Sequence, residues 1–353
     1  MFDFPASPTV GQIINGPGGS PYQWDGTKWT PTAFVQQPLG NTASLGTRNY
    51  LHNPRFRWWQ RGAGPFSASG NLTADRFGIG LVNDTLTAQQ FGIQDPGRAS
   101  IGDERAMWAL QSNVTGSATA GSFSQLIQRL EHLWRFSGKP VIVSFWASNG
   151  GTALSQISVN LMQYYGTGGS PTASAWLTAQ IIPISGTWTR YSALFNVPSS
   201  SGKTFGSNND SNLVLSWFLS ASSAAAAGSL TQQSGTLYLW GAQLEVAQPG
   251  QTQPSAFDCP DEQTDYNNCR RFYQIGQFEV AGYSTAGGGM GYAHVLTPIM
   301  RGTPTMTSSS VTQTNCTGSI TPGATANSFI PYATTTATGS VIYSGQWQAS
   351  ADI

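Results

Sequence analysis

The strongest constraint on the fold is a series of short segments in which apolar and polar residues alternate. Alternation with period two places successive side chains on opposite faces of an extended strand. Glycine, serine, asparagine and proline separate the segments at the spacing typical of a β-sandwich. The clearest segments are residues 106–111, 141–147, 157–162, 189–195 and 212–218. We therefore expect an all-β fold.

The low charge of the chain excludes several classes of partner. Only 9% of residues are charged and the formal net charge is zero, against about 25% charged residues in an average domain. A neutral chain lacks the basic surface that nucleic acids and anionic membranes attract. No run approaches ~18 apolar residues, and no basic stretch precedes an apolar core at the N-terminus. We expect no nucleic acid, no membrane insertion and no signal peptide, whereas low charge suits surfaces buried in an assembly.

Turn signals and composition divide the 353 residues into three units. In residues 1–38, Asp25-Gly26 between alternating segments predicts an N-terminal β-hairpin module. Residues 39–50 lack periodicity and indicate a linker. Residues 51–250 hold the sandwich segments, and residues 251–353 suggest a small C-terminal β-domain. A short helix is expected at its start, over 261–273, because acids come early and bases late.

One helix is also predicted inside the sandwich unit. Leu126, Leu130 and Leu133 recur at helical spacing within residues 124–133. Gly138 and Pro140 would end this helix before the next strand. His132 would then be an ordinary residue on the helix face.

The three cysteines are too few for a disulfide framework. Cys259, Cys269 and Cys316 are expected to be reduced thiols, although a Cys259–Cys269 bridge stays open at this point. With only three histidines, none near a cysteine in sequence, zinc is not expected.

The sequence carries no catalytic signature. A glycosidase holds two carboxylates across a cleft, but the acidic residues here are scattered and nothing in the sequence pairs them. No histidine accompanies a nucleophile elbow of the G-x-S-x-G type. The run Gly287-Gly288-Gly289 lacks the Lys-Ser/Thr of a phosphate-binding loop. We expect that the protein is not an enzyme.

Several motifs resemble those of one group of proteins. They are the runs 53–62 (NPRFRWWQRG), 74–77 (ADRF), 126–131, 138–147 and 237–246, followed by 268–273 and 300–305. In this order the motifs of residues 51–250 resemble the carbohydrate-binding-module-like jelly roll found in bacteriophage tail fibres and other virion surface proteins. The resemblance implies opening and closing strands at 53–77 and 237–246. It also implies phage-type terminal modules, with residues 1–38 attaching to other virion proteins.

The resemblance implies a function as well. A virion structural protein of this kind, assembled in the host cytoplasm as a homotrimer, would attach to the host by binding surface polysaccharide without covalent chemistry. Two alternatives stay open. A capsid decoration or head-fibre protein would use the jelly roll as scaffold only, and a polysaccharide depolymerase would need two facing carboxylates.

Sugar binding relies on aromatic side chains, because the C–H-rich face of a pyranose stacks on an exposed ring. The candidate glycan contacts are Trp58, Trp59, Tyr164, Tyr165, Trp176 and Trp188. Trp58 and Trp59 are adjacent and would point to opposite faces of a strand. Jelly rolls of this kind often hold a structural Ca²⁺, for which Asp75, Asp103 and Glu245 are candidate ligands. No other cofactor is expected.

Overall fold

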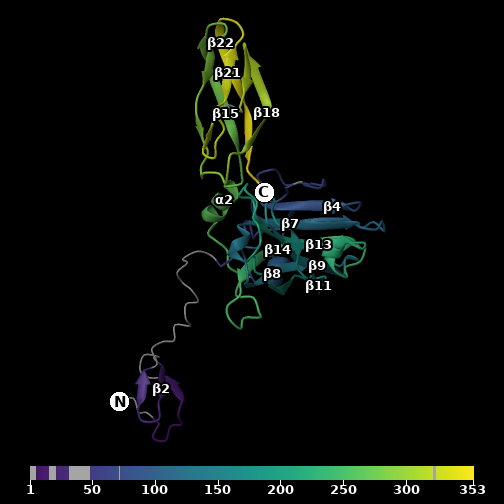
Figure 1. The fold of residues 1–353 in the computed structure, drawn as a ribbon, viewed down its shortest axis with the longest axis vertical. Helices are drawn as coiled ribbons and strands as arrows, with labels where there is room; N and C mark the ends of the chain where they lie inside the picture. Colours follow the sequence, from purple (N-terminus) through teal and green to yellow (C-terminus); the bar gives the residue numbers. More distant parts are fainter. Residues whose placement is uncertain (1–4, 16–20, 32–47, 71, 321–322) are drawn as a thin grey trace. The chain divides into compact units, whose positions relative to one another are not determined.

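The computed structural model describes residues 5–15, 21–31, 48–70, 72–320 and 323–353. The chain divides into two compact units, Met1–Thr47 and Arg48–Ile353. The linker predicted over 39–50 lies outside the described residues, apart from 48–50. Most of the regular secondary structure in the described part of the chain is β-strand, so the all-β prediction is confirmed (Figure 1).

The first unit contains the expected hairpin. β2 (Pro21–Trp24) and β3 (Trp29–Pro31) pair antiparallel, and β1 (Ile13–Asn15) adds a third strand on the other edge of β2. The Asp25 carboxylate accepts the backbone N–H groups of Thr27 and Lys28 at 2.8 and 2.9 Å, which fixes the turn. The rings of Trp24 and Trp29 then meet across the two strands, with centroids 5.6 Å apart.

The second unit begins with a β-sandwich (Figure 1). One sheet has the order β10-β9-β13-β7-β4, with β11 also paired to β9, and the other has the order β12-β8-β14-β6-β5. The strands are β4 (Phe77–Val82), β5 (Thr85–Gly92), β6 (Trp108–Thr115), β7 (Phe123–Glu131), β8 (Pro140–Ser148), β9 (Gln156–Tyr164), β10 (Ala175–Trp176), β11 (Gln180–Pro183), β12 (Thr189–Asn196), β13 (Asn212–Ala221) and β14 (Ser234–Val246). All the described pairings between these strands are antiparallel.

A single apolar core fills the space between the two sheets. Trp217 of β13 is fully buried and meets Phe145 of β8 edge to face at 6.0 Å, and the Phe77 ring of β4 also lies 6.0 Å from it. Burial of one such side chain contributes about 1.5–3 kcal/mol. The core therefore follows from the alternating segments that the sequence shows.

The helix predicted over 124–133 is wrong, because residues 124–131 belong to strand β7 and the last two residues follow it. Ser124, Leu126, Gln128 and Leu130 are buried in strict alternation. The polar Gln128 is accommodated because its side chain accepts from the backbone N–H of His52 at 2.9 Å and donates to the His52 carbonyl at 3.0 Å. Because the polar Gln128 occupies a position on the buried face, the apolar residues do not recur at every second position. The leucines that remain stand at a spacing typical of a helix.

His132 is likewise not on a helix face. It follows β7 with a positive φ of 65° and precedes the short 3₁₀ turn η2 (Leu133–Arg135). His132 therefore marks the point where the chain leaves the sheet.

The expected opening strand at 53–77 is also corrected. Residues 53–62 run through turns, with positive φ at Asn53 and Phe56, and the first strand of the sandwich is β4 from Phe77. The Asn53 side chain holds this segment by accepting from the N–H of Trp58 at 3.0 Å and donating to its carbonyl at 2.9 Å. Trp58 and Trp59 therefore do not lie on opposite faces of a strand. The closing segment 237–246 does form a central strand, β14.

The helix expected before the C-terminal sheets is present as α2 (Glu262–Arg270). Its N-cap Asp261 accepts the N–H of Thr264 at 3.0 Å. Three small sheets follow, in the orders β15-β22-β18, β16-β21-β19 and β17-β20. The strands are β15 (Tyr273–Ser284), β16 (Gly289–Gly291), β17 (His294–Val295), β18 (Thr305–Thr314), β19 (Cys316–Ser319), β20 (Ser328–Phe329), β21 (Tyr332–Thr335) and β22 (Gly339–Ser350). They enclose a second apolar core around Phe278, Tyr343 and Trp347.

The three cysteines are free thiols, so Cys259 and Cys269 are not bridged. None of the helices in the described part of the chain has the length and apolar character needed to span a membrane.

Candidate functional site

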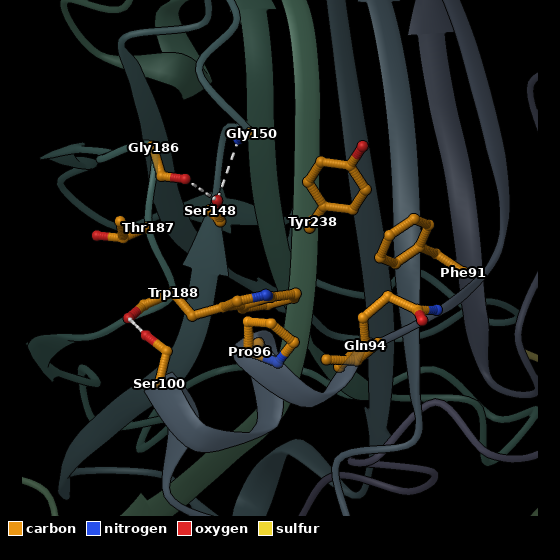
Figure 2. A pocket seen from close by; sticks show the side chains of 12 residues that line it. Phe91, Gln94, Pro96, Ser100, Ser148, Gly150, Gly186, Thr187, Trp188 and Tyr238 are labelled. Carbon is orange, nitrogen blue, oxygen red and sulfur yellow. Dashed lines mark hydrogen bonds between the residues drawn. The ribbon is translucent and has the colours of Figure 1, made fainter.

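A hollow of about 370 Å³ lies over the outer face of the five-stranded sheet (Figure 2). Its floor comes from β14 and β5, and its walls come from the short helix α1 (Asp95–Ile101) and the loop that precedes β12. The lining residues are Phe91, Ile93, Gln94, Pro96, Gly97, Ser100, Ser148, Gly150, Gly186, Thr187, Trp188 and Tyr238. All of them are uncharged.

Strand alternation aims two aromatic side chains into this hollow. Leu237 and Leu239 of β14 are in the core, so Tyr238 between them faces outward. On β5, Leu86 and Ala88 face the core and Phe91 lies on the opposite face. The rings of Phe91 and Tyr238 have centroids 4.6 Å apart, and Trp188 lies 6.3 Å from Tyr238 on the other side (Figure 2).

Two glycines let these rings sit close to the backbone. A Cβ on Gly150 would lie 2.8 Å from the Tyr238 ring, and the residue has a positive φ of 58°. A Cβ on Gly97 of α1 would lie 3.1 Å from Nε1 of Trp188. Glycine at both positions keeps the rings in place against the walls.

Hydrogen bonds tie the loops of the hollow together. The Ser148 hydroxyl donates to the Gly186 carbonyl at 2.8 Å and accepts the N–H of Gly150 at 3.0 Å. The Ser100 hydroxyl of α1 donates to the Trp188 carbonyl at 3.2 Å (Figure 2). The loops are thus held to α1 and to the end of β8 before any ligand arrives.

A strip of side-chain amides continues from the hollow along the sheet. We call Gln89, Gln111 and Asn113 the amide strip. Gln111 of β6 is the register partner of both Tyr238 on β14 and Gln89 on β5. Gln89 donates to Gln111 at 3.0 Å, and Asn113 accepts from the Thr236 hydroxyl at 2.9 Å. Each amide nitrogen carries two hydrogens, so the strip offers donors as well as acceptors to a ligand.

Charges near the hollow are balanced by their neighbours. Arg98 of α1 pairs with Asp95 and Glu104 and donates to the Ile93 carbonyl at 2.7 Å. Asp103 pairs with Arg105, and the hydrogen bond from that guanidinium lowers the pKa of Asp103. The site is therefore suited to an uncharged, hydroxyl-rich ligand more than to an ion.

The structure separates the six predicted aromatic contacts. Trp188 lines the hollow, Tyr164 and Trp176 line two other hollows, and Tyr165 is buried with its hydroxyl donating to Gln163. Trp58 packs against Tyr266 with tilted rings whose centroids are 4.4 Å apart, and it donates from Nε1 to Asp265 of α2.

Trp59 is also engaged inside the protein. It packs on the core and donates to the Phe56 carbonyl at 2.7 Å. Sequence reasoning missed Phe91, Tyr238 and the amide strip. For Tyr238, Gln111 and Asn113 the available signal was their alternation with buried residues on the same strand. Phe91 has no such signal, because Gln90 and Gly92 beside it are only partly buried.

The three candidate calcium ligands are far from forming one site. Asp75 accepts from the backbone and side chain of Gln60, Glu245 accepts from Ser255, and Asp103 pairs with Arg105. Burial raises the pKa of Asp75, which disfavours its charged form. Within the described ranges, no three His, Cys, Asp or Glu side chains are placed to share a metal ion.

No family model matches the sequence, and no curated protein is similar to it. Solved structures do show similarity. The family 11 carbohydrate-binding module of the cellulosomal cellulase Lic26A-Cel5E of Clostridium thermocellum is 9% identical, with a TM-score of 0.32, over 53% of this chain and 95% of that chain. The CBM22-2 xylan-binding domain of Paenibacillus barcinonensis Xyn10C is 14% identical, with a TM-score of 0.31, over 52% and 100%.

A viral protein is among these similar structures. The enzymatically active domain of bacteriophage CBA120 tailspike protein 4 is 12% identical, with a TM-score of 0.30, over 56% of this chain. This chain spans 21% of that tailspike chain. Similarity at this level supports no conclusion about function. The function is therefore inferred from the geometry of the site.

Proposed function

We propose that the protein is a glycan-binding component of a bacteriophage fibre or similar virion appendage, and that it attaches the virion to host surface polysaccharide. The observation that carries the proposal is the uncharged hollow of Trp188, Tyr238 and Phe91 that continues into the amide strip. Partly exposed rings beside paired amides are the two chemical elements that sugar recognition needs.

The binding mechanism requires no covalent step. A pyranose would stack its C–H face on the Trp188 and Tyr238 rings, while the next sugar units would exchange hydrogen bonds with Gln111 and Asn113. Hydroxyl groups donate and accept, as the side-chain amides do. Because the loops are already held by Ser148 and Ser100, little ordering cost is expected on binding.

The wider assembly is part of the same proposal. A homotrimer would present three copies of the site and gain affinity through avidity. Exposed apolar side chains in the C-terminal part of the chain, including Tyr283, Val295 and Ile299, would be covered by the subunit contacts of such a trimer. The three-stranded unit around Trp24 and Trp29 would attach to another virion protein, since so small a sheet gains stability from a partner.

The test is binding of the full-length protein to host cells and to a printed oligosaccharide array. Trp188→Ala and Tyr238→Ala are each expected to weaken binding at least about tenfold, because each removes a stacking surface of about 1.4 kcal/mol or more. Trp134→Ala is the matched control, since Trp134 is 61% exposed on η2 and does not line the hollow.

Saturable cell binding that competes with soluble host polysaccharide supports the proposal. If folded wild-type protein binds neither cells nor any array glycan, glycan binding is ruled out and a scaffold role in the virion takes its place.

A further inference from the structure

The C-terminal domain contains a second hollow, of about 560 Å³, that the proposed function does not use. It lies among β15, β22, β18 and the segment that leads into β17. The lining residues are Gln277, Phe278, Glu279, Tyr292, His294, Ser310, Ser344, Gly345 and Gln346. None of them lines the hollow over the sandwich.

Two features of the strands create this hollow. Gly345 stands opposite Phe278 in the β15–β22 register and contributes no side chain, and a Cβ there would lie only 3.0 Å from the Ser309 carbonyl. The pairing of β18 with β22 shifts between Ser309 and Thr312, and Ser310 in this bulge has a positive φ of 52°. A bulge redirects the chain locally and is frequent beside binding sites.

A short wall of rings borders the hollow. Tyr292 is 43% exposed, and its hydroxyl accepts the backbone N–H of Glu279 at 3.1 Å, which fixes the ring. His294 lies 5.2 Å from Tyr292 and stacks on the buried Phe329 at 5.1 Å. Burial lowers the pKa of His294, which favours its neutral form. Tyr292 and His294 thus offer an aromatic edge that is backed by the buried Phe329 and by the hydrogen bond to Glu279.

The small number of charged residues in the C-terminal sheets indicates which class of ligand this hollow suits. Between Phe272 and Ala351 the sequence has two charged residues, Glu279 and Arg301. Arg301 pairs with Glu131 of the sandwich at 3.0 Å, which leaves Glu279 at the hollow. The hollow presents amides, hydroxyls, one carboxylate and two aromatic rings, and this combination suits a neutral sugar. The hydroxyl groups of the sugar donate to carboxylates and amide oxygens, while an aromatic ring packs on its C–H groups. An acidic sugar would meet the Glu279 charge without a compensating cation.

We propose that this hollow is a second binding site for neutral saccharides, independent of the site over the sandwich. Its volume falls within the range of about 300–1,000 Å³ that small-ligand pockets occupy. Two sites on one chain raise the affinity for a long polysaccharide by multivalency.

The experiment uses full-length protein in which Trp188→Ala and Tyr238→Ala disable the first site. An array of neutral oligosaccharides of two to six sugar units is the probe. We expect at least one oligosaccharide to remain bound, and its affinity to fall at least tenfold when Tyr292→Ala is added. Tyr292→Phe keeps the ring and is expected to retain most of the affinity. Tyr283→Ala is the matched control, because Tyr283 is 73% exposed on the same domain and outside the hollow.

A second measurement does not depend on variants. Titration of the bound oligosaccharide into the protein with the first site disabled is expected to shift the ring-proton NMR signals of His294 and to leave those of His132 unchanged. The proposal is overturned if no oligosaccharide binds once the first site is disabled. It is also overturned if Tyr292→Ala does not change the affinity for the bound oligosaccharide and the oligosaccharide does not shift the His294 signals. If the hollow over the sandwich binds no glycan, the results expected for the second hollow do not change, because they are measured with the first site disabled. The two proposals are therefore distinguishable.

Discussion

Arg76 and Asp352 form an ion pair, with Nη1 2.7 Å from Oδ1, between positions 276 residues apart in the sequence. The Arg76 side chain is 3% exposed and lies over the Phe272 ring, 3.4 Å from its centroid. Arg61 contacts the other carboxylate oxygen of Asp352 at 2.6 Å. Asp352 thus bridges two arginines, one with each carboxylate oxygen, where the sandwich meets the C-terminal sheets.

Asp352→Asn is expected to lower the free energy of unfolding by about 3 kcal/mol, because it leaves the buried Arg76 guanidinium without its counter-charge. Urea denaturation monitored by tryptophan fluorescence measures this loss. Asp103→Asn breaks the more exposed pair with Arg105 and is expected to cost less than about 1 kcal/mol. Equal losses in the two variants would contradict the role assigned to Asp352.

Asp265 is expected to make stability depend on pH. Burial raises its pKa from 3.8 to about 6, although the N–H of Asn53 at 2.9 Å favours the charged form. A carboxyl whose pKa is raised by folding contributes stability below its unfolded pKa and loses it as pH rises through the folded value. Stability should therefore fall between pH 4 and pH 6 by up to about 3 kcal/mol, at roughly 1.4 kcal/mol per pKa unit.

Asp265→Asn keeps the acceptor for Asn53 and cannot ionise. The difference in unfolding free energy between Asp265→Asn and wild type should therefore shift in favour of the variant as pH rises from 4 to 7. Asp75, whose pKa is also raised, contributes the same trend to both proteins, so the difference between them retains only its electrostatic coupling to Asp265. A difference that stays constant over this pH range would refute the assignment to Asp265.

Gly150→Ala is expected to weaken glycan binding about tenfold, a cost of about 1.4 kcal/mol. The new Cβ would lie 2.8 Å from the Tyr238 ring and displace it. Gly151→Ala is a close control, because Gly151 also has a positive φ, of 78°, but nothing lies within 4 Å of its added Cβ. Both variants carry backbone strain of order 1 kcal/mol. A difference between their glycan affinities therefore reports the displacement of Tyr238. Calorimetric titration measures both affinities.

Gln111→Leu tests the amide strip. Leucine preserves the size of the side chain and removes hydrogen bonds, so we expect affinity for oligosaccharides to fall by about 1–3 kcal/mol while the melting temperature changes little. Gln313→Leu, on exposed β18, should leave affinity unchanged. Unaltered affinity in Gln111→Leu would exclude the strip from the binding surface.

The cysteines are expected to be unreactive in the folded protein. Burial raises the pKa of Cys259 to about 12 and that of Cys269 well above its usual value, so neither forms much thiolate at pH 8. Cys316 is buried and donates to the Ile342 carbonyl at 3.2 Å. A thiol-reactive dye should label none of them at pH 8 until denaturant is added, when all three react. Rapid labelling of Cys269 without denaturant would contradict its burial.

The elements that could be predicted from the sequence are those whose signals are local. Residues 141–147 and 212–218 alternate or run apolar over a whole strand, and β8 and β13 occupy them. The Asp25-Gly26 turn and the capped helix α2 were predictable for the same reason, since a turn or a cap depends on residues within a few positions.

Strand β7 and the candidate site depend instead on contacts between residues far apart in the sequence. β7 escaped prediction because Gln128 is stabilised in the interior by His52, 76 residues away. The candidate site could not be read from the chain because Phe91, Trp188 and Tyr238 belong to three separate segments. Only the register of β5, β6 and β14 aligns Gln89, Gln111 and Tyr238 across one face, and register is fixed by the packing of both sheets rather than by any one strand.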